Sequence, residues 1–253
     1  QPRSRGLGDV YKRQFQITVD GGQKYHDKQR ILKNGHGTYE RIISNLLLIQ
    51  EMIPSDIFIV LRTNVGEENY KFMEEYIHES IINFGKCENI LFAFHNIGNW
   101  GERNSKIIEK DVRFELASKV IEQGGRTVPF IWSMTASNLC YASIKNHYVI
   151  GSDGLVYKCT VALYQANNIL GRIGKGGKLL ISENKESLWV NSTETEECKS
   201  CSVLPICMNN RCPLKRLNAD SLQYCISSKD KTSDMILMLE KQNLITYEIG
   251  IEV

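Results

Sequence analysis

Seven of the eight cysteines fall into two groups whose spacing suits metal chemistry. One is a pair and the other a group of five within 28 positions; they read Cys140…Gly154-x4-Cys159 and Cys198-x2-Cys201-x5-Cys207-x4-Cys212…Cys225. Thiolates are soft ligands suited to iron–sulfur clusters or zinc, and four per site is usual for either. One zinc ion would use four of the seven. Two clusters can use all seven if one iron keeps a non-protein ligand or an open position, so the count favours two clusters.

The composition excludes several classes of protein. The 253 residues are 42% hydrophobic and 24% charged, and eight cysteines are too few for a disulfide scaffold. Lys and Arg number 31 against 29 Asp and Glu, so charge does not point to nucleic acid. No apolar run approaches the roughly 20 residues of a membrane span, and there is no secretory signal. We therefore expect a cytoplasmic protein that binds neither nucleic acid nor membrane, with Cys87 as a small buried residue.

The first 14 residues do not resemble natural protein sequence. The chain starts at Gln1, and residues 9–14 look like the translated end of a transposon used to build sequencing libraries. Residues 1–14 are accordingly interpreted as a sequencing-adaptor artefact, and the natural sequence as truncated near Phe15; the alternative is a native basic N-terminal tail.

Three strand–helix units precede the cysteines and must position any ligand. Predicted strands cover 15–19, 57–61 and 90–95. One predicted helix begins with Thr38 as its N-cap, and two more cover 67–84 and 111–123. Repeated strand–helix units imply parallel strands with right-handed crossovers, as in a doubly wound sheet or part of a β/α barrel. Such folds place ligands at the carboxyl ends of the strands.

From about Cys140 the composition changes, and Gly, Asn and Cys become frequent. Short β-like pieces at 148–150 and 155–157 flank Ser152-Asp153-Gly154 and predict a hairpin, in which Asp153 serves turn geometry. Residues 193–228 carry five cysteines without an apolar period, so a metal must stand in for the missing core. A last short helix is expected at 235–239.

The cysteine pattern resembles the SPASM domain, the seven-cysteine C-terminal extension of radical-SAM enzymes that mature peptides and proteins. Residues 154–159, Gly-Leu-Val-Tyr-Lys-Cys, and 204–207, Leu-Pro-Ile-Cys, also fit. The family usually has three residues between the last two cysteines of the run, whereas four separate Cys207 from Cys212.

The resemblance extends upstream. Residues 16–21 with His26, Asp27 and Arg30 are similar to the fourth barrel strand and loop of these enzymes, and residues 61–65 with Asn69 to the fifth. The fold expected from it is α/β, with the C-terminal part of a partial (β/α)6 radical-SAM barrel at 15–135. A SPASM domain would follow at 136–230, and a C-terminal helix and tail at 231–253.

The resemblance also implies the ligands. Cys140, Cys159 and Cys212 would bind a first auxiliary [4Fe–4S] cluster, and Cys198, Cys201, Cys207 and Cys225 a second. Met134 lies about where relatives often have a fourth cysteine for the first cluster, which implies an open iron there. Thr18, Arg30 and Asn64 would bind S-adenosylmethionine, with Thr18 and Arg30 at its amino and carboxylate groups.

The activity implied is reductive cleavage of S-adenosylmethionine to a 5′-deoxyadenosyl radical, which abstracts hydrogen from a peptide. That chemistry needs a Cys-x3-Cys-x2-Cys cluster near the first barrel strand, and no such spacing occurs in this chain. By resemblance, lost N-terminal strands carried it, and the fragment itself should not turn over. An electron donor such as flavodoxin or ferredoxin is implied.

The substrate is constrained by Thr160. Sulfatase-maturing relatives have a catalytic aspartate at that position, so the residue argues against formylglycine formation and favours a maturase of ribosomally made peptides. Two other classes stay open: a zinc-binding interaction module and an iron–sulfur electron carrier without its own substrate. His95, at the end of the third strand, is the one histidine placed to face a barrel mouth, and a structural role is favoured for it.

Overall fold

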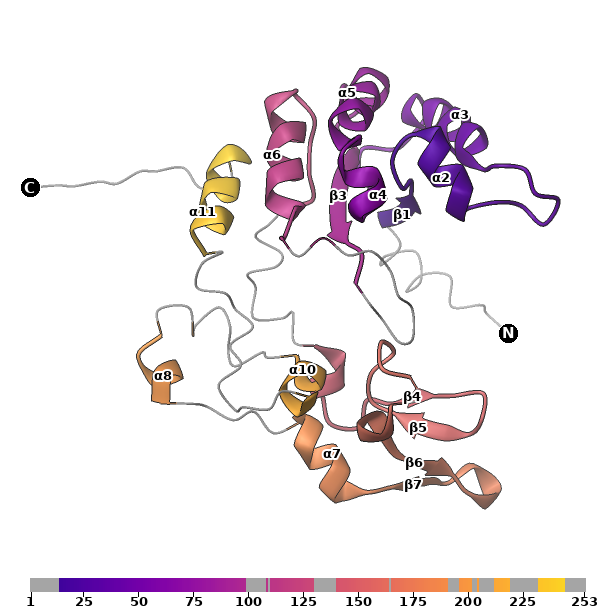
Figure 1. Ribbon diagram of the computed structural model, residues 1–253, viewed down its shortest axis with the longest axis vertical. Helices are drawn as coiled ribbons and strands as arrows, with labels where there is room; N and C mark the ends of the chain where they lie inside the picture. Colours follow the sequence, from indigo (N-terminus) through magenta and orange to yellow (C-terminus); the bar gives the residue numbers. More distant parts are fainter. Residues whose placement is uncertain are drawn as a thin grey trace, which may run out of the picture. The chain divides into compact units, whose positions relative to one another are not determined.

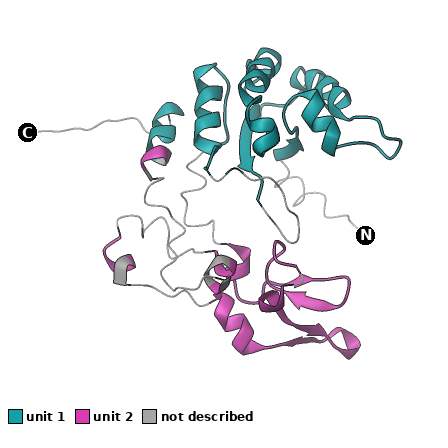
Figure 2. Cartoon of the chain, in the orientation of Figure 1, with its two compact units in different colours: residues 1–99, 104–129, 236–253 teal, residues 100–103, 130–235 magenta. Residues whose placement is uncertain are grey.

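The computed structural model describes residues 14–98, 108, 110–129, 140–163, 165–190, 196–201, 204, 212–218 and 232–243. Cys207, Cys225 and Met134 lie outside the described residues. The chain divides into two compact units, coloured in Figure 2. Unit 1 comprises residues 1–99, 104–129 and 236–253, and unit 2 comprises 100–103 and 130–235.

Unit 1 is an α/β unit built on a parallel sheet of order β1-β2-β3, in agreement with the predicted class (Figure 1). Its elements are β1 (Gln14–Thr18), α2 (Gln23–Gln29), α3 (Tyr39–Gln50), β2 (Phe58–Val65), α4 (Glu67–Tyr70), α5 (Met73–Phe84), β3 (Ile90–Asn96), α6 (Arg113–Glu122) and most of α11 (Thr232–Lys241). Neighbouring strands are consecutive in sequence. Because right-handed crossovers between such strands all return on the same side, the connecting helices share one face of the sheet.

The residues of β2 show the two faces of this sheet. Ile59, Leu61 and Val65 belong to the core cluster that also holds residues of α3, α5 and α6, so odd positions face the helices. The intervening even positions point to the opposite face, where Val60 is buried and Arg62 and Asn64 are half-buried. Because the helices between the described strands lie on the other side, we call this the helix-free face.

The chain continues the parallel pattern after α6. Thr127 forms a parallel bridge with Phe92 of β3. The end of α11 packs on the same region: Lys241 Nζ lies 2.7 Å from Glu122 Oε1 and also contacts Ser118, and Gln242 Nε2 lies 2.6 Å from Thr127 Oγ1. Residues more than 100 positions apart therefore complete unit 1.

Three sequence predictions need correction in detail. The helix predicted over 67–84 is two helices, α4 and α5, separated at Lys71 and Phe72. Thr38 is the N-cap residue of α3, as predicted, but its hydroxyl bonds to the Arg30 carbonyl and makes no capping hydrogen bond; Asp27 accepts from the first N–H groups instead. The first strand covers Gln14–Thr18, with Gln14 paired to Phe58, rather than the predicted 15–19.

Unit 2 contains an antiparallel sheet in which the four strands follow one another, order β4-β5-β6-β7. Its elements are β4 (Val149–Ile150), β5 (Leu155–Tyr157), β6 (Ile169–Ile173), β7 (Leu179–Ile181), α7 (Glu183–Val190), α8 (Glu196–Lys199), α10 (Pro213–Asn218) and 3-10 turns at Tyr141–Ser143, Ala166–Asn168 and Lys175–Gly177. The predicted hairpin is β4–β5, and Asp153 accepts from the Leu155 backbone N–H at 2.9 Å, as turn geometry predicts. β6, β7 and α7 were not predicted.

The buried cluster of unit 2 is small and includes a cysteine. Its members are Ala142, Cys159, Ala162, Leu170, Trp189 and Leu214, with Cys140 and Cys212 among the partly buried residues packed against it. Within the described part of the chain, no helix is long and apolar enough to cross a membrane.

Candidate functional site

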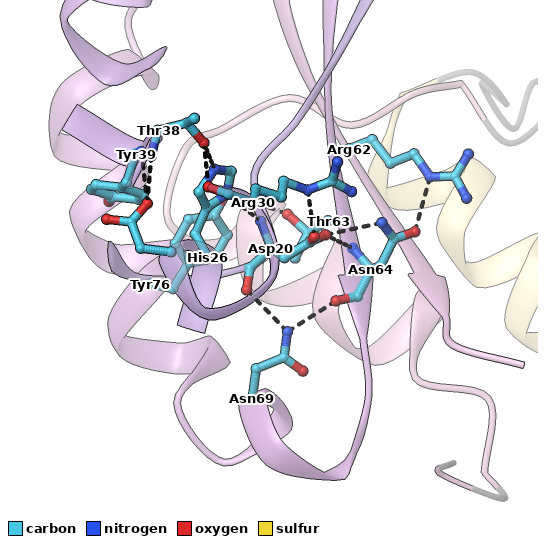
Figure 3. Close-up of polar contacts among 11 residues, drawn as sticks. Asp20, His26, Arg30, Thr38, Tyr39, Arg62, Thr63, Asn64, Asn69 and Tyr76 are labelled. Atoms are coloured by element: carbon cyan, nitrogen blue, oxygen red, sulfur yellow. Dashed lines mark hydrogen bonds and ion pairs between the residues drawn. The ribbon is translucent and has the colours of Figure 1, made fainter. Parts of the chain in front are cut away.

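Asp20 organises the carboxyl ends of β1 and β2. It lies two residues after the end of β1 and is 4% exposed. Its Oδ1 accepts from the backbone N–H and side-chain Nδ2 of Asn64, at 3.0 and 2.9 Å, while its Oδ2 accepts from Arg30 Nε at 2.7 Å (Figure 3). Its carbonyl oxygen accepts from Asn69 Nδ2 at 3.1 Å, and Asn69 Nδ2 also reaches the Asn64 carbonyl at 2.9 Å. Asp20 therefore joins the loop after β1 to the end of β2.

His26 fixes the loop that carries Arg30. The Asp20 backbone N–H donates to His26 Nδ1 at 3.2 Å, so the ring proton resides on Nε2, 2.9 Å from Thr38 Oγ1. Thr38 in turn donates its hydroxyl proton to the Arg30 carbonyl oxygen at 2.8 Å. His26 is fully buried, and burial lowers its pKa below the usual value against the opposing effect of Asp20 and Asp27. The imidazole is thus a neutral spacer of defined tautomer.

Asp27 closes the same loop from the other side. Its Oδ1 accepts from the backbone N–H groups of Thr38 and Tyr39, at 2.8 and 2.9 Å. These groups open α3, where the first N–H groups have no partner within the helix. A carboxylate there is also favoured by the helix dipole. The sequence His26-Asp27 therefore anchors both the loop and the helix that follows it.

A second arginine lies on the helix-free face. Arg62 Nε donates to Asn64 Oδ1 at 3.1 Å. His95 pairs with Asn64 across the sheet. Its pKa is lowered by burial and, less strongly, by the positive charges of Arg62 and Arg113. The ends of β2 and β3 therefore present positive charge close together.

The structure brings the three residues predicted to bind S-adenosylmethionine to neighbouring strand ends. Thr18, the last residue of β1, pairs with Arg62 and is half-buried, whereas Arg30 and Asn64 meet at Asp20. Among the residues that the structure describes, Asp20 uses one donor of each side chain, which leaves a second amide N–H on Asn64 and both terminal nitrogens on Arg30.

A cavity of about 390 Å³ lies on the helix side of unit 1. It lies between α2, the start of α3 and α5, and its walls include Tyr25, Tyr39, Phe72 and Glu79. None of Thr18, Arg30 and Asn64 lines it. Tyr39, whose backbone N–H binds Asp27, is the link between this cavity and the loop that carries Arg30.

Three of the predicted metal ligands are gathered in unit 2. Cys140, Cys159 and Cys212 all pack in or against its apolar cluster. Burial raises the pKa of the Cys140 thiol, and the nearby Cys212 and Cys159 raise it further, so the three sulfurs lie within electrostatic range. Cys198 and Cys201 are one turn apart, the N–H of Cys201 donating to the carbonyl of Cys198 at 3.1 Å. Cys87 packs partly buried against the core of unit 1.

Within the residues that the structure describes, no three His, Cys, Asp or Glu side chains are arranged so that they could hold a metal ion.

Asn168 holds the Cys159 segment in place. Asn168 is fully buried, and its Oδ1 accepts from the N–H groups of Lys158 and Cys159 at 3.0 and 2.8 Å. Its Nδ2 donates to the carbonyls of Cys159 and Ala162 at 2.7 and 2.9 Å. One amide side chain therefore fixes the backbone on both sides of the Cys159 sulfur.

A buried ion pair supports the same segment. Lys158 Nζ lies 3.1 Å from Glu186 Oε1 and donates to the Ile144 carbonyl at 2.6 Å. Burial alone would raise the pKa of Glu186, but the Asn146 N–H, Lys158 and Tyr148 together hold it below the usual value. Because the pair is fully hydrogen-bonded, it satisfies the condition under which buried charges are tolerated.

Tyr141 links the cysteine pair to Thr160. Its hydroxyl oxygen lies 2.6 Å from Thr160 Oγ1 and accepts from the Thr160 N–H at 2.9 Å. The same hydroxyl lies 3.9 Å from Cys159 Sγ, within range of a weak hydrogen bond to sulfur. Thr160 is thus a neutral residue next to Cys159 that is hydrogen-bonded to Tyr141.

Comparison with known proteins shows what the fold resembles. No family model matches the sequence, and no curated protein matches it. Solved structures of the sulfatase-maturating radical-SAM enzyme anSMEcpe do match. The structure with bound AdoMet gives a TM-score of 0.50 at 13% identity over 91% of this chain and 68% of that one. The structure that also holds the Kp18Cys peptide gives a TM-score of 0.51 at 13% identity, over 92% of this chain and 70% of that one. The structure with the Cp18Cys peptide gives 0.52 at 13% identity, over 91% of this chain and 69% of that one.

These matches concern the fold: the chain is a mixed α/β protein with a parallel sheet, and its fold is similar to that of the anSMEcpe structures. The central residue of the polar network, Asp20, was not singled out from the sequence. Its partners lie six to 49 positions away, so no local pattern identifies it. The sequence signal was its place directly after the first predicted strand, at the edge where such folds bind ligands.

Proposed function

We propose that this chain is part of a radical-SAM enzyme that modifies a peptide or protein and carries two auxiliary [4Fe–4S] clusters. The observation that carries the proposal is the shared apolar environment of Cys140, Cys159 and Cys212 in a chain whose fold matches radical-SAM maturases. Cys198, Cys201, Cys207 and Cys225 would hold the second cluster. The matched structures were solved with AdoMet and peptides, which supports the same ligand classes here.

The residues of unit 1 suit S-adenosylmethionine. Arg30 is clamped by Asp20 through Nε, which leaves its two terminal nitrogens to bind a carboxylate. Thr18 offers a hydroxyl for the amino group, and Asn64 a remaining amide N–H. When bound and reduced, the cofactor supplies the one-electron chemistry that removes a hydrogen atom from the substrate. The chain's own residues bind and orient it.

The residues of unit 2 suit clusters that serve electron transfer or substrate ligation. Asn168 and the Lys158–Glu186 pair hold Cys159, and Tyr141 brings a hydroxyl within 3.9 Å of its sulfur. Thr160 cannot act as a carboxylate base, which favours a peptide maturase over a formylglycine-forming enzyme. Since the sequence contains no Cys-x3-Cys-x2-Cys spacing, we expect the 253 residues to need a further segment for turnover, with electrons from a flavodoxin or ferredoxin.

Metal analysis of anaerobically purified protein tests the proposal. We expect about eight irons with equal sulfide and a broad absorption band in the visible blue. Cys140→Ser should remove about half of the iron, whereas the matched control Cys87→Ser, outside both groups, should remove none. About one zinc in a colourless sample would reject the proposal and favour a zinc-binding interaction module.

Retained iron without AdoMet binding would instead indicate an electron carrier. Binding of AdoMet is measured on the chain joined to the missing cluster segment, comparing Arg30→Gln with the control Arg126→Gln. Loss of affinity in the first variant alone supports the maturase.

A further inference from the structure

Two arginines share one polar chain across the ends of β1 and β2. Arg30 Nε binds Asp20 Oδ2 at 2.7 Å, Asp20 Oδ1 accepts from Asn64 Nδ2 at 2.9 Å, and Asn64 Oδ1 accepts from Arg62 Nε at 3.1 Å (Figure 3). Each guanidinium is therefore held by its Nε. In the part of the chain that the structure describes, the terminal nitrogens of both make no other hydrogen bond.

The two arginines differ in how their charge is balanced. Arg30 has Asp20 as a carboxylate partner, and Arg113, which lies near His95, has Asp111 at 2.7 Å. Arg62 is half-buried, and among the described residues it has no carboxylate partner; its Nε contact is to a neutral amide. Charges withdrawn from water are normally paired. Arg62 is thus a partly desolvated cation with an open position for an anion.

The surroundings of Arg62 also favour binding of an anion. Arg62 lies on the helix-free face, near the carboxyl ends of parallel strands, where folds of this kind bind ligands. His95 has its pKa lowered by burial and by Arg62 and Arg113, so the local potential is positive. A guanidinium fixed at Nε presents its two terminal N–H groups as a preordered fork, the geometry that matches a carboxylate.

We propose that Arg62 is a substrate-binding residue that receives a carboxylate of the peptide substrate. Arg30 is left for the carboxylate of the cofactor, and Asn64 spaces the two forks. The substrate class is then a peptide with an acidic side chain or a free C-terminus beside the reacting residue. Only the assignment of this carboxylate to a substrate rests on the proposed function, because carboxylate capture at Arg62 needs neither clusters nor turnover.

The test is NMR titration of the arginine Nε–H signals in the protein, with signals assigned from Arg30→Lys and Arg62→Lys. Four probes distinguish the sources: N-acetylglutamate α-amide for a side chain, N-acetylglycine for a C-terminus, S-adenosylhomocysteine for the cofactor, and neutral N-acetylglutamine amide. We expect a saturable shift of the Arg62 signal with one or both of the first two probes and none with the neutral probe.

Variants decide whether the fork is responsible. Arg62→Gln should weaken carboxylate binding about tenfold or more, as expected for loss of charge-assisted hydrogen bonds. Arg126→Gln, which removes an exposed arginine paired with Glu88, should change it less than about twofold. An unchanged Arg30 signal in Arg62→Gln shows that the network is still folded.

Three results would overturn the inference. They are no shift of the Arg62 signal with either carboxylate probe, a shift of that signal with S-adenosylhomocysteine alone, or equal binding by Arg62→Gln. Iron content is measured on the same sample, so a failure here is separable from a failure of the cluster proposal.

Discussion

Asp20 contributes every polar atom it has to a different neighbour. Its amide reaches His26, its carbonyl Asn69, and its carboxylate Asn64 and Arg30. Asp20 is only 4% exposed, and each of its polar atoms has a hydrogen-bond partner. Changing one atom therefore destabilises the fold, because a buried polar group without a partner bears its full desolvation penalty.

Asp20→Asn should therefore destabilise unit 1. The new amide turns N–H groups toward either Arg30 or Asn64, both of which donate. We expect a loss of about 2–4 kcal/mol in the free energy of unfolding, measured by urea denaturation. The control Glu51→Gln, at an exposed carboxylate, should change it by less than about 0.5 kcal/mol. Equal losses in the two variants would contradict the role given to Asp20.

His26 makes stability depend on pH. Its folded pKa lies below the ordinary 6.5, so the unfolded chain binds more protons just below neutrality. The stabilisation is complete above about pH 6.5 and is lost as pH falls toward the folded pKa, at about 1.4 kcal/mol per unit of difference. His95, also lowered, has the same sign.

Urea denaturation of the wild type, His26→Asn and His95→Asn between pH 5 and 8 measures this effect. Each variant should show a shallower fall below pH 6.5, and the double variant the shallowest. A wild-type curve that is flat over this range would contradict the buried neutral imidazole.

At the scale of elements, the start of α3 depends on a glycine. A Cβ at Gly37 would lie 2.1 Å from Asp27 Oδ2, so Gly37→Ala must displace the carboxylate that caps the helix. We expect a loss of about 1–2 kcal/mol, the usual cost of a lost cap. Gly22→Ala is the matched control, since its Cβ would meet nothing within 4 Å. Thermal unfolding followed by circular dichroism measures both, and an equal shift in both would argue against capping by Asp27.

The loop of Cys159 depends on Asn168 in the same way. Asn168→Ala removes four hydrogen bonds at once and should lower the unfolding free energy of unit 2 by about 2–4 kcal/mol. Asn184→Ala, at an exposed position of α7, serves as control. Iron content should fall in the first variant only; unchanged iron and stability would remove Asn168 from the site.

The sequence predicts elements whose pattern is local. β1 was recognisable from its alternating β-forming residues, and β2 and β3 from their apolar runs. The β4–β5 hairpin was recognisable because Asp153-Gly154 is a turn sequence. The break between α4 and α5 was missed because buried Met73, Tyr76 and Ile77 continue the helical spacing. β6 and β7 were missed because Gly171 and Gly174 hide the alternation.

The site could be predicted only in part. The cysteines follow one another at short spacings and so are visible in the sequence. The Arg30–Asp20–Asn64–Arg62 chain depends on contacts across 44 positions, and Asn168 and Glu186 act on residues 9 to 28 positions earlier. Pairings of that kind are fixed by the fold, which a single sequence shows only through its strands.

At the scale of the whole molecule, the units differ in how much apolar core they contain. Unit 1 buries a continuous cluster from β1 through α6, whereas the described cluster of unit 2 is small and includes Cys159. If clusters complete unit 2, iron chelation should unfold it and leave unit 1 intact. Limited proteolysis with and without chelator should then cut within 130–235 only after iron is removed. Cleavage of both units together, or of neither, would contradict this division.

The return of α11 to unit 1 has a consequence for biosynthesis. Lys241 and Gln242 contact Glu122 and Thr127, so unit 1 is finished by residues made after all of unit 2. A ribosome delivers the chain from its N-terminus, and domains generally fold in that order. Here unit 1 emerges first but stays incomplete until unit 2 has been synthesised, so its folding cannot finish before unit 2 has left the ribosome. If unit 2 takes up the proposed clusters, their insertion can begin before unit 1 is closed.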